Sequence, residues 1–407
     1  MTTPSCGAIV APEPGLSGEE MLARARAMRG VLRERQERCE ALGRLPEDTR
    51  DDFVDAGFFR VLQPRRFGGY ELGLGVFHQV ATELSRGCPS SGWVYALTAG
   101  HPHTFASWPE AAQIEVYGDD GNVVIPLSGL PVGRITPVEG GYRLSGAWDY
   151  SSGCDIATHF IGVALQTTAS PADARFCLVE RERFSIVDNW DVLGMRGTGS
   201  RRVVVEDVFV PEYRTLVAPG PEGAAFDRPG TALYENPIYS GPFGSFLLSE
   251  VVAVAVGIGW AALDVYEEML RAKKMSYPPS SQRSEDHLYQ EWYGRAYALV
   301  DTAEAALVQT GRDYEEWCRR QREDGVAFDD ELNRRLLLRE QSCVQLCWDA
   351  VDILFRSAGT SGTRSGDRLL RCFRDLAEVR THITLQHERS AENFGRVRFG
   401  MVPTTLY

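Results

Sequence analysis

Residues 140–155 read Gly-Gly-Tyr-Arg-Leu-Ser-Gly-Ala-Trp-Asp-Tyr-Ser-Ser-Gly-Cys-Asp, and this stretch decides what the middle of the chain can form. Gly140-Gly141 lies between two runs with the composition of β-strands, which is typical of a hairpin turn. Short β-branched runs bounded by Gly, Pro or Asp cover residues 122–126, 134–138, 142–148, 159–165, 175–179 and 202–210. The sequence therefore predicts a small antiparallel sheet here.

A helical period replaces this pattern on both sides. Ser17-Gly-Glu-Glu20 has the spacing of a capping box. We expect Pro46 to open the next helix and Gly57 to end it. Towards the C-terminus the helical period covers residues 247–275, 286–323 and 329–357, each far longer than the average helix of about 11–12 residues. Long helices joined by short polar turns predict an up-and-down bundle.

The order of these patterns predicts an α+β fold that is mainly α. We expect an N-terminal helical domain over residues 1–120, an antiparallel β domain over 121–235 and a four-helix bundle over 236–407. A chain of 407 residues is long enough for two or three domains, because single cores stop growing at roughly 250–300 residues.

Charge narrows the possible partners. The chain has 43 Lys and Arg against 56 Asp and Glu, a formal net charge of −13. Such a chain has no general attraction for nucleic acid or anionic membranes. The longest apolar run, near residues 251–262, is too short to span a bilayer and is expected to be broken by Gly257 and Gly259. We therefore expect neither nucleic acid nor membrane as a partner.

The nine cysteines favour a reduced, cytoplasmic protein. Nine is an odd number and most are scattered singly. Cys343 and Cys347 are four apart in a helical stretch, with no second pair or nearby His to complete a metal site. The first fifteen residues lack the basic and then apolar pattern of a signal peptide. No metal is expected.

Three motifs resemble the acyl-CoA dehydrogenase superfamily. They are the stretch from Phe53 through Gly57-Phe58-Phe59 to Phe67-Gly68-Gly69-Tyr70, residues 140–155, and residues 190–200, which read Trp-Asp-Val-Leu-Gly-Met-Arg-Gly-Thr-Gly-Ser. The resemblance implies the same layout of helices, sheet and bundle, with a flavin between sheet and bundle. It also implies that the second motif lies along the flavin ring and that the third walls its site.

One departure points to a branch of that superfamily. Arg374-Asp375 matches the dehydrogenases, but their Glu-Gly-Thr is gone and His382 stands beside its place. The chain is similar to the flavin-dependent monooxygenases, which include two-component hydroxyphenylacetate and phenol hydroxylases, dibenzothiophene monooxygenase and amino-sugar N-oxygenases. The resemblance implies reduced flavin (FMNH2 or FADH2) and molecular oxygen as cosubstrates, a C4a-hydroperoxyflavin, and transfer of oxygen to an aromatic ring or a nitrogen. No Rossmann fingerprint is present, so a separate NAD(P)H:flavin reductase is the expected partner.

The resemblance assigns roles to individual residues. Three groups are expected, namely catalytic His101, Ser152 and His382; flavin-binding Trp148, Ser151, Trp190, Arg196, Thr198, Ser200 and Arg374; and substrate-binding Trp93, His103 and Phe243. In the expected division of work one histidine acts on the substrate and the other hydrogen-bonds the peroxide.

Structural roles compete with these assignments. His101 can be a polar helix-end residue before Pro102, with His103 as its rival for the substrate. His382 can be a core-edge residue, the two tryptophans can be sheet packing, the serines can be turn formers, and the arginines can be solvated.

Two further functions remain open from the sequence. One is an oxidase or dehydrogenase of the same fold that keeps its FAD bound. The other is an inactive family member that serves as a binding protein. Either way, a homotetramer is implied by the resemblance and by the surplus of apolar positions in the bundle, and the expected ligand is a small molecule.

Overall fold

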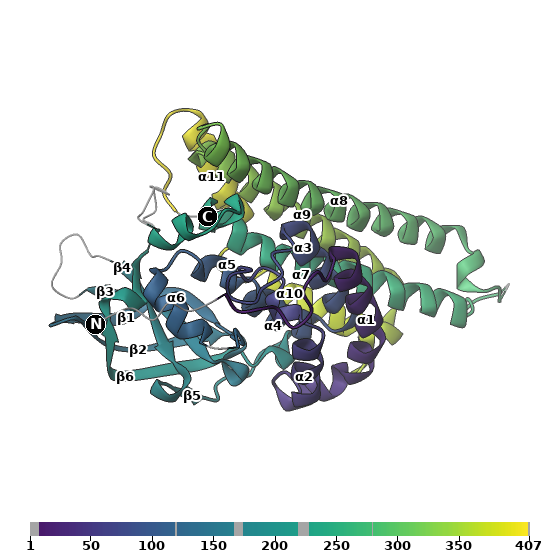
Figure 1. Cartoon of the computed structure of the whole chain (residues 1–407). Helices are drawn as coiled ribbons and strands as arrows, with labels where there is room; N and C mark the ends of the chain where they lie inside the picture. Colours follow the sequence, from purple (N-terminus) through teal and green to yellow (C-terminus); the bar gives the residue numbers. More distant parts are fainter. Residues whose placement is uncertain (1–7, 119, 167–173, 219–227, 279, 406–407) are drawn as a thin grey trace.

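The computed structural model describes residues 8–118, 120–166, 174–218, 228–278 and 280–405. Figure 1 shows the sheet at one end of the molecule and the helices from both ends of the chain gathered at the other. The N-terminal helices are α1 (Gly18–Leu42), α2 (Glu47–Asp55), α3 (Leu74–Gly87), α4 (Pro89–Ala99), α5 (His101–Phe105) and α6 (Glu110–Tyr117). The C-terminal helices are α7 (Phe243–Ala272), α8 (His287–Glu323), α9 (Asp330–Ala358), α10 (Arg368–Val379) and α11 (His387–Arg398).

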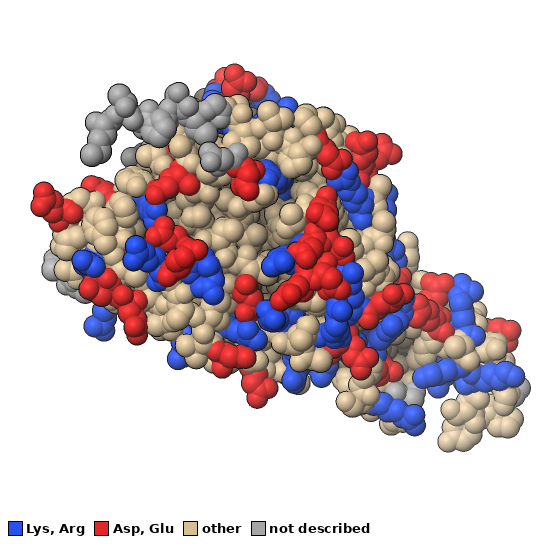
Figure 2. Space-filling view, turned by 60° about the horizontal axis from the view of Figure 1, so that its bottom comes forward, with Lys and Arg blue, Asp and Glu red and all other residues tan. Residues whose placement is uncertain are grey.

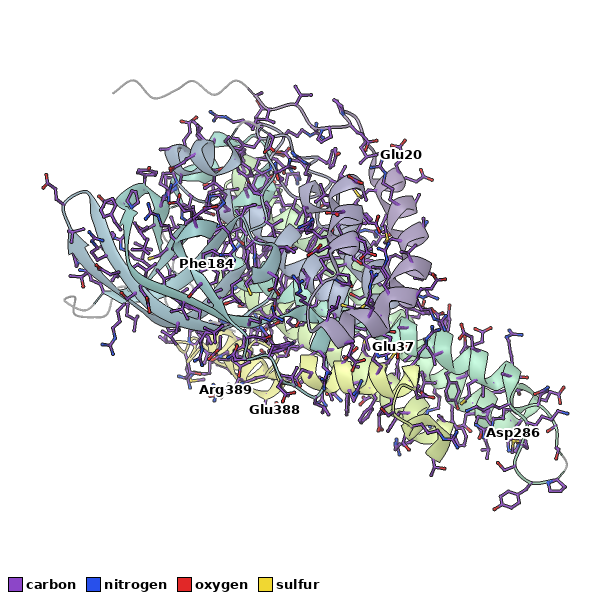
Figure 3. All side chains as sticks on the ribbon, turned by 90° about the horizontal axis from the view of Figure 1, so that it is seen from below. Glu20, Glu37, Phe184, Asp286, Glu388 and Arg389 are labelled. Atoms are coloured by element: carbon purple, nitrogen blue, oxygen red, sulfur yellow. The ribbon has the colours of Figure 1, made fainter. Side chains whose placement is uncertain are left out.

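The helix boundaries follow the local chemistry that the sequence indicates. The backbone N–H of Ser17 donates to the Glu20 carboxylate at 2.8 Å, and that of Glu20 to the Ser17 hydroxyl at 3.2 Å, so the capping box is confirmed. Gly57 follows α2 with φ +74°, a left-handed conformation that suits glycine. Asp286 caps α8 by accepting a hydrogen bond from Leu288 N at 3.0 Å. In Figure 3 it lies at the far tip of the long helices.

Seven strands form one sheet in the order β5-β6-β2-β1-β3-β4-β7. They are β1 (Leu127–Val138), β2 (Gly141–Ser151), β3 (His159–Gln166), β4 (Ala174–Glu180), β5 (Ser185–Val187), β6 (Arg201–Pro211) and β7 (Thr215–Val217). The hairpin at Gly140 is confirmed, because Val138 pairs with Gly141 and Gly140 has φ +78°. Neighbouring strands are antiparallel except β1 and β3, which are parallel. Because β2 is antiparallel to β1, it ends beside the start of β1. β3 is parallel to β1, so it starts at that same end of the sheet.

The sequence misplaced some strand ends. Residues 122–126 are not a strand of the sheet, although the carbonyls of Val124 and Pro126 still accept bonds from the chain around β3. β1 begins at Leu127, ahead of the expected residue 134, because register shifts on either side of Pro131 disturb its alternation. β5 and β7 have three residues each, too few to show a period of two.

The two faces of the sheet pack into different cores. In β3, Ile161 and Val163 belong to the large core shared with the helices. Phe160 and Ala164 point to the other face, into a second core. In Figure 3 the second core can be located by Phe184, within the sheet part of the molecule. The sheet is therefore packed on both sides, which makes it a rigid support for the turns at its strand ends.

α7 is one continuous helix through Gly257 and Gly259, so these glycines do not interrupt it. They permit close packing instead. A Cβ on Gly257 would lie 2.5 Å from the Thr82 carbonyl of α3, and the Thr82 hydroxyl donates to Ala253 O at 3.2 Å. Among the described residues, α7 is long and apolar enough to cross a membrane, but 89% of its most apolar window is buried, as in a core helix.

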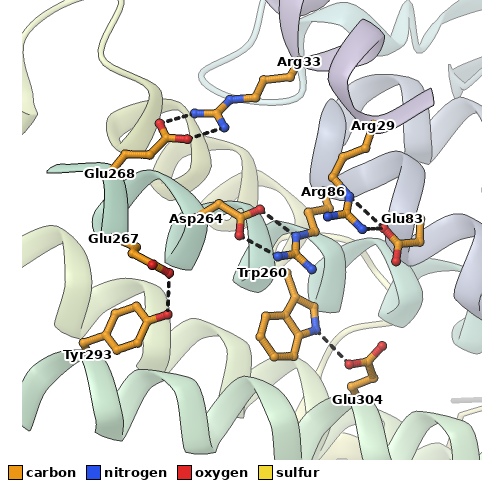
Figure 4. Close-up of polar contacts among 10 residues, drawn as sticks. All are labelled: Arg29, Arg33, Glu83, Arg86, Trp260, Asp264, Glu267, Glu268, Tyr293 and Glu304. Atoms are coloured by element: carbon orange, nitrogen blue, oxygen red, sulfur yellow. Dashed lines mark hydrogen bonds and ion pairs between the residues drawn. The ribbon is translucent and has the colours of Figure 1, made fainter. Parts of the chain in front are cut away.

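Charged side chains pair rather than gather by sign. On the face in Figure 2, acidic and basic residues interleave. Figure 4 shows α1, α3 and α7 joined by such pairs. Arg86 of α3 donates to both carboxylate oxygens of Asp264 at 2.6 Å, and Arg33 of α1 to both of Glu268. The Arg86 guanidinium also lies over the Trp260 ring, 5.3 Å from its centroid. This bidentate pair ties the N-terminal helices to the bundle.

We predict that Arg86→Ala destabilises the protein by about 1–2 kcal/mol, more than an exposed pair would, because the Arg86 and Asp264 side chains are only 23% and 30% exposed. Thermal unfolding should show a melting temperature lower by about 1–2 °C. Arg271→Ala is the matched control, since Arg271 pairs with Glu267 while itself 73% exposed, and it should shift unfolding little. Equal effects of the two changes would contradict the prediction.

Candidate functional site

The end of β2 meets helix α4. β2 ends at Ser151, and the next residue, Ser152, accepts a hydrogen bond from the Trp93 indole N–H at 2.9 Å. Gly153 has φ +80°, and a Cβ there would lie 2.6 Å from the Thr98 methyl group. The Ser-Ser-Gly turn thus reverses the chain and also lets α4 approach closely, which fixes Ser152 in a buried position.

A second turn comes to the same place from residues 195–200. The short 3₁₀ turn η4 (Arg196–Thr198) starts after Met195, which has φ +51°. A Cβ on Gly197 would lie 2.4 Å from the Cys39 sulfur, so the turn packs directly on α1. The Ser200 hydroxyl is then 2.7 Å from that of Ser152 and 2.8 Å from that of Thr198. Ser152, Ser200 and Thr198 form what we call the hydroxyl row.

The direction of hydrogen bonding in the row follows from its two ends. The Trp93 N–H can only donate, and the Met195 carbonyl, which accepts from the Thr198 hydroxyl at 2.9 Å, can only accept. Each hydroxyl has one proton, so Ser200 must donate to Thr198, and Ser152 must donate to Ser200. All hydroxyl protons are used within the row. The one bonding position that Ser152 has left is therefore a lone pair, an acceptor.

His382 lies beside the start of the row. α10 ends at Val379, and the turn that follows brings the His382 ring edge-on to Trp93, with 5.6 Å between centroids. Its Nδ1 is 2.8 Å from the Thr384 hydroxyl and accepts from Thr384 N at 3.4 Å. Burial lowers the pKa of His382 to about 4, so the ring is neutral near pH 7. Because Nδ1 accepts, the single ring proton is on Nε2, which is a donor.

Helix α10 holds the η4 turn in place through Asp375. Its buried carboxylate accepts from Met195 N at 2.7 Å, and burial raises its pKa to about 7. A Cβ on Gly194 would lie 2.2 Å from the Arg374 carbonyl, so helix and turn are in direct contact. The same helix therefore positions both the row, through Met195, and His382.

Arg196 and Arg374 meet at a carboxylate that the sequence did not reveal. Arg374 donates to Glu40 Oε1 at 2.7 Å, and Arg371 donates to Glu40 Oε2 at 2.6 Å. The Arg196 guanidinium is 3.9 Å from Glu40 Oε1 and is 46% exposed. Three positive charges face one negative charge, next to the turn that carries Thr198.

His101 and His103 lie apart from this group, at the junction of α5 with α7. His101 Nδ1 donates to the Ile125 carbonyl at 2.6 Å, and its Nε2 is 3.8 Å from the Glu250 carboxylate. His103 donates to the Ile238 carbonyl at 2.8 Å. Burial lowers the pKa to about 4 for His101 and about 3 for His103. Their roles at the substrate stay predictions, because no hydrogen bond of either reaches Trp93, Ser152 or His382 within the described part of the chain.

The remaining expected residues have mostly structural surroundings. Trp148 is fully buried in the second core, where it donates to Val163 O at 2.9 Å and packs against the sheet, and its role at the flavin stays a prediction. Ser151 donates to Trp148 O at 3.0 Å within its own turn. Trp190 donates to Met195 O at 3.3 Å and supports the η4 turn from outside. Phe243 starts α7 with its ring edge-on to Phe176.

Two cavities lie elsewhere, and most of the charged side chains that line them are paired. One of about 400 Å³ lies between α1, α3, α7 and α10 and is lined by Arg33, Arg86 and their carboxylate partners. Another of about 390 Å³ lies at the sheet, beside Arg214 and Glu115, which pair with each other. Neither is lined by Trp93, Ser152 or His382. Cavity size therefore does not locate the candidate site, whereas the convergence of polar groups does.

A flavin fits the residues that converge here. The hydroxyl row offers acceptors, His382 Nε2 offers a donor, and the excess positive charge of Arg196 and Arg374 near Glu40 suits a phosphate. No group of His, Cys, Asp and Glu that could hold a metal ion occurs among the described residues. These groups come both from the sheet end, which carries the hydroxyl row, and from α10 and the turn after it, which carry Arg374 and His382.

Comparison with known proteins agrees with this fit. The family model "Acyl-CoA dehydrogenase, C-terminal domain" matches residues 250–387. The oxygenase subunit HsaA of a flavin-dependent monooxygenase from Rhodococcus jostii (strain RHA1) is 32% identical over 93% of this chain and 98% of its own. The oxygenase component of p-hydroxyphenylacetate 3-hydroxylase from Acinetobacter baumannii is 26% identical over 97% of this chain and 92% of its own.

A solved structure gives the same answer for the fold. XiaF from Streptomyces sp., in complex with FADH2 and glycerol, superposes with a TM-score of 0.87 at 25% identity, over 95% of this chain and 97% of its own. With helices, sheet and bundle in the same order, and with a relative 32% identical over nearly its whole length, the chain belongs to the flavin-dependent monooxygenases of the acyl-CoA dehydrogenase superfamily.

Proposed function

We propose that the chain is the oxygenase component of a two-component system. It takes reduced flavin, FMNH2 or FADH2, from a separate NAD(P)H:flavin reductase and hydroxylates a small aromatic or amine substrate with molecular oxygen. The direction of the hydroxyl row supports this proposal, because every hydroxyl proton is used within the row and only lone pairs are left to bind a ligand. Reduced flavin has an N–H at N5, whereas oxidised flavin has an unprotonated N5 that needs a donor. An acceptor row therefore favours the reduced form.

The chain's own groups then have separate tasks. Bound reduced flavin supplies the two electrons with which one oxygen atom enters the substrate and the other leaves as water. His382 holds its Nε2 proton as a donor beside Trp93, where it can bind an oxygen atom of the reacting group. Its neutral state matters, since a donor that does not titrate near pH 7 is available throughout the physiological range.

The proposed substrate is a small aromatic molecule, as for the p-hydroxyphenylacetate hydroxylase among the relatives. Trp93 lies on the side of α4 that contacts Ser152. His101 and His103 lie in α5, just beyond the C-terminal end of α4. His103 is stacked on Phe246, with 3.8 Å between centroids, so this region of α5 and α7 is aromatic as well as polar. A ring with one polar substituent suits such surroundings.

His382→Ala should uncouple oxygen use from product formation. The change removes the Nε2 donor, and a lost hydrogen bond to a charged group is worth roughly 1.5–3 kcal/mol, so the ratio of hydrogen peroxide to product should rise about tenfold or more. The measurement supplies reduced FMN or FAD from a reductase and quantifies oxygen consumed, peroxide released and product formed.

His387→Ala is the matched control for this test. His387 is exposed at the start of α11, five residues away, and its loss should leave coupling unchanged. Wild-type coupling in His382→Ala would show that His382 has only its structural role.

We further propose a cytoplasmic homotetramer. Support comes from α8, which projects beyond the rest of the molecule in Figure 1 and exposes Leu288 and Tyr297, each 43% accessible. Apolar side chains on a projecting helix are typical of a subunit interface. Size-exclusion chromatography with light scattering at micromolar protein should give four times the chain mass of 45.2 kDa. A monomer under these conditions would rule the tetramer out.

A further inference from the structure

Glu250 is a buried acid that the site described above does not use. It lies on α7 with no exposed surface, and neither of its carboxylate oxygens has a hydrogen-bond partner among the described residues. An unpaired buried carboxyl is costly, and native proteins rarely keep one without a reason. Burial raises the pKa of Glu250 well above its usual range, which favours the protonated carboxyl over the carboxylate.

The chain leaves room for this carboxyl next to His101. A Cβ on Gly100 would lie 1.9 Å from Glu250 Oε1, so any residue larger than glycine would displace the acid. The other oxygen, Oε2, is 3.8 Å from His101 Nε2. The acid is thus packed over the first turn of α5, and among the described residues His101 is the titratable side chain in contact with it there.

The tautomer of His101 is fixed by its other nitrogen. Nδ1 is 2.6 Å from the Ile125 carbonyl, which can only accept, so Nδ1 carries the proton. A neutral ring then has a bare lone pair at Nε2, on the side of the Glu250 carboxyl. A donor acid and an acceptor nitrogen face each other across 3.8 Å, about 1 Å more than a direct hydrogen bond.

We propose that Glu250 is a positioning residue for His101: its carboxyl O–H donates to Nε2, so that the ring is held at both nitrogens, by Ile125 on one side and Glu250 on the other. This inference rests on the proposed function in taking His101 as a residue whose ring packs on the substrate side, since its two nitrogens are bonded to Ile125 and Glu250. It explains both the unpaired acid on α7 and the glycine opposite it. It also makes α7 responsible for aligning a residue of the N-terminal helices.

The test compares three variants by ¹⁵N NMR of histidine-labelled protein without flavin, with the His101 signals assigned through His101→Asn. Glu250→Leu keeps apolar packing but removes the donor, so the Nε2 signal should move to that of an unbonded ring nitrogen. Glu250→Gln keeps an N–H donor and should restore the signal towards wild type. Glu340→Gln is the matched control, because Glu340 on α9 is an equally buried acid whose oxygens also lack partners; it should leave His101 unchanged.

A turnover assay adds a second readout, with phenol as the probe substrate and reduced FMN. Product per oxygen should fall about tenfold in Glu250→Leu and recover at least in part in Glu250→Gln. An Nε2 signal that is the same in Glu250→Leu and wild type would overturn the proposal. If the signal moves as expected while the wild-type protein does not bind reduced FMN, the pairing stands and the proposed function fails, so the two are separable.

Discussion

The site depends on one run of hydrogen bonds, from the Trp93 indole through Ser152, Ser200 and Thr198 to the Met195 carbonyl. It joins α4, the end of β2 and the η4 turn, which are far apart in the sequence. Each bond contributes only about 1 kcal/mol, but a buried hydroxyl left without its partner costs about 1–3 kcal/mol. Because the end groups have no choice of direction, the whole row is oriented, and successive bonds polarise one another.

The rest of the fold can be understood as the support for this run. Gly153 and Gly197 allow α4 and α1 to come close enough for the two turns to meet. Asp375 holds Met195 from α10, and the turn after α10 places His382 against Trp93. The sheet below is packed on both faces, with Trp148 filling one of them. Turns on rigid supports are a common way to hold functional groups in place.

Much of this architecture could be predicted from the sequence, because strong local signals carry it. The capping box at Ser17, the hairpin at Gly140 and the three long helical periods each have a physical cause within a few residues. Sequence analysis did not predict the short strands β5 and β7 or the early start of β1. These features form by pairing with neighbouring strands, and no local sequence pattern shows that pairing.

The candidate site divides in the same way. The resemblance picked out Trp93, Ser152, Thr198, Ser200 and His382, and the structure brings these five together. Trp148 was predicted to contact the flavin, and the structure encloses it in a core. Sequence alone cannot separate a tryptophan that packs a core from one that contacts a flavin. Glu40 and Glu250 were missed, because a single acid in a helical stretch looks like a solvated residue until its arginine or histidine partners are seen.

The central claim is that an acceptor row selects reduced flavin, and an anaerobic titration tests it most directly. Purified protein is titrated with reduced and with oxidised FMN and FAD, and binding is followed by fluorescence or calorimetry. The protein should purify without flavin and bind the reduced form at least tenfold more tightly, a difference of about 1.4 kcal/mol. Equal affinities for the two forms, or a protein that purifies with stoichiometric FAD, would contradict it and favour an oxidase or dehydrogenase of the same fold.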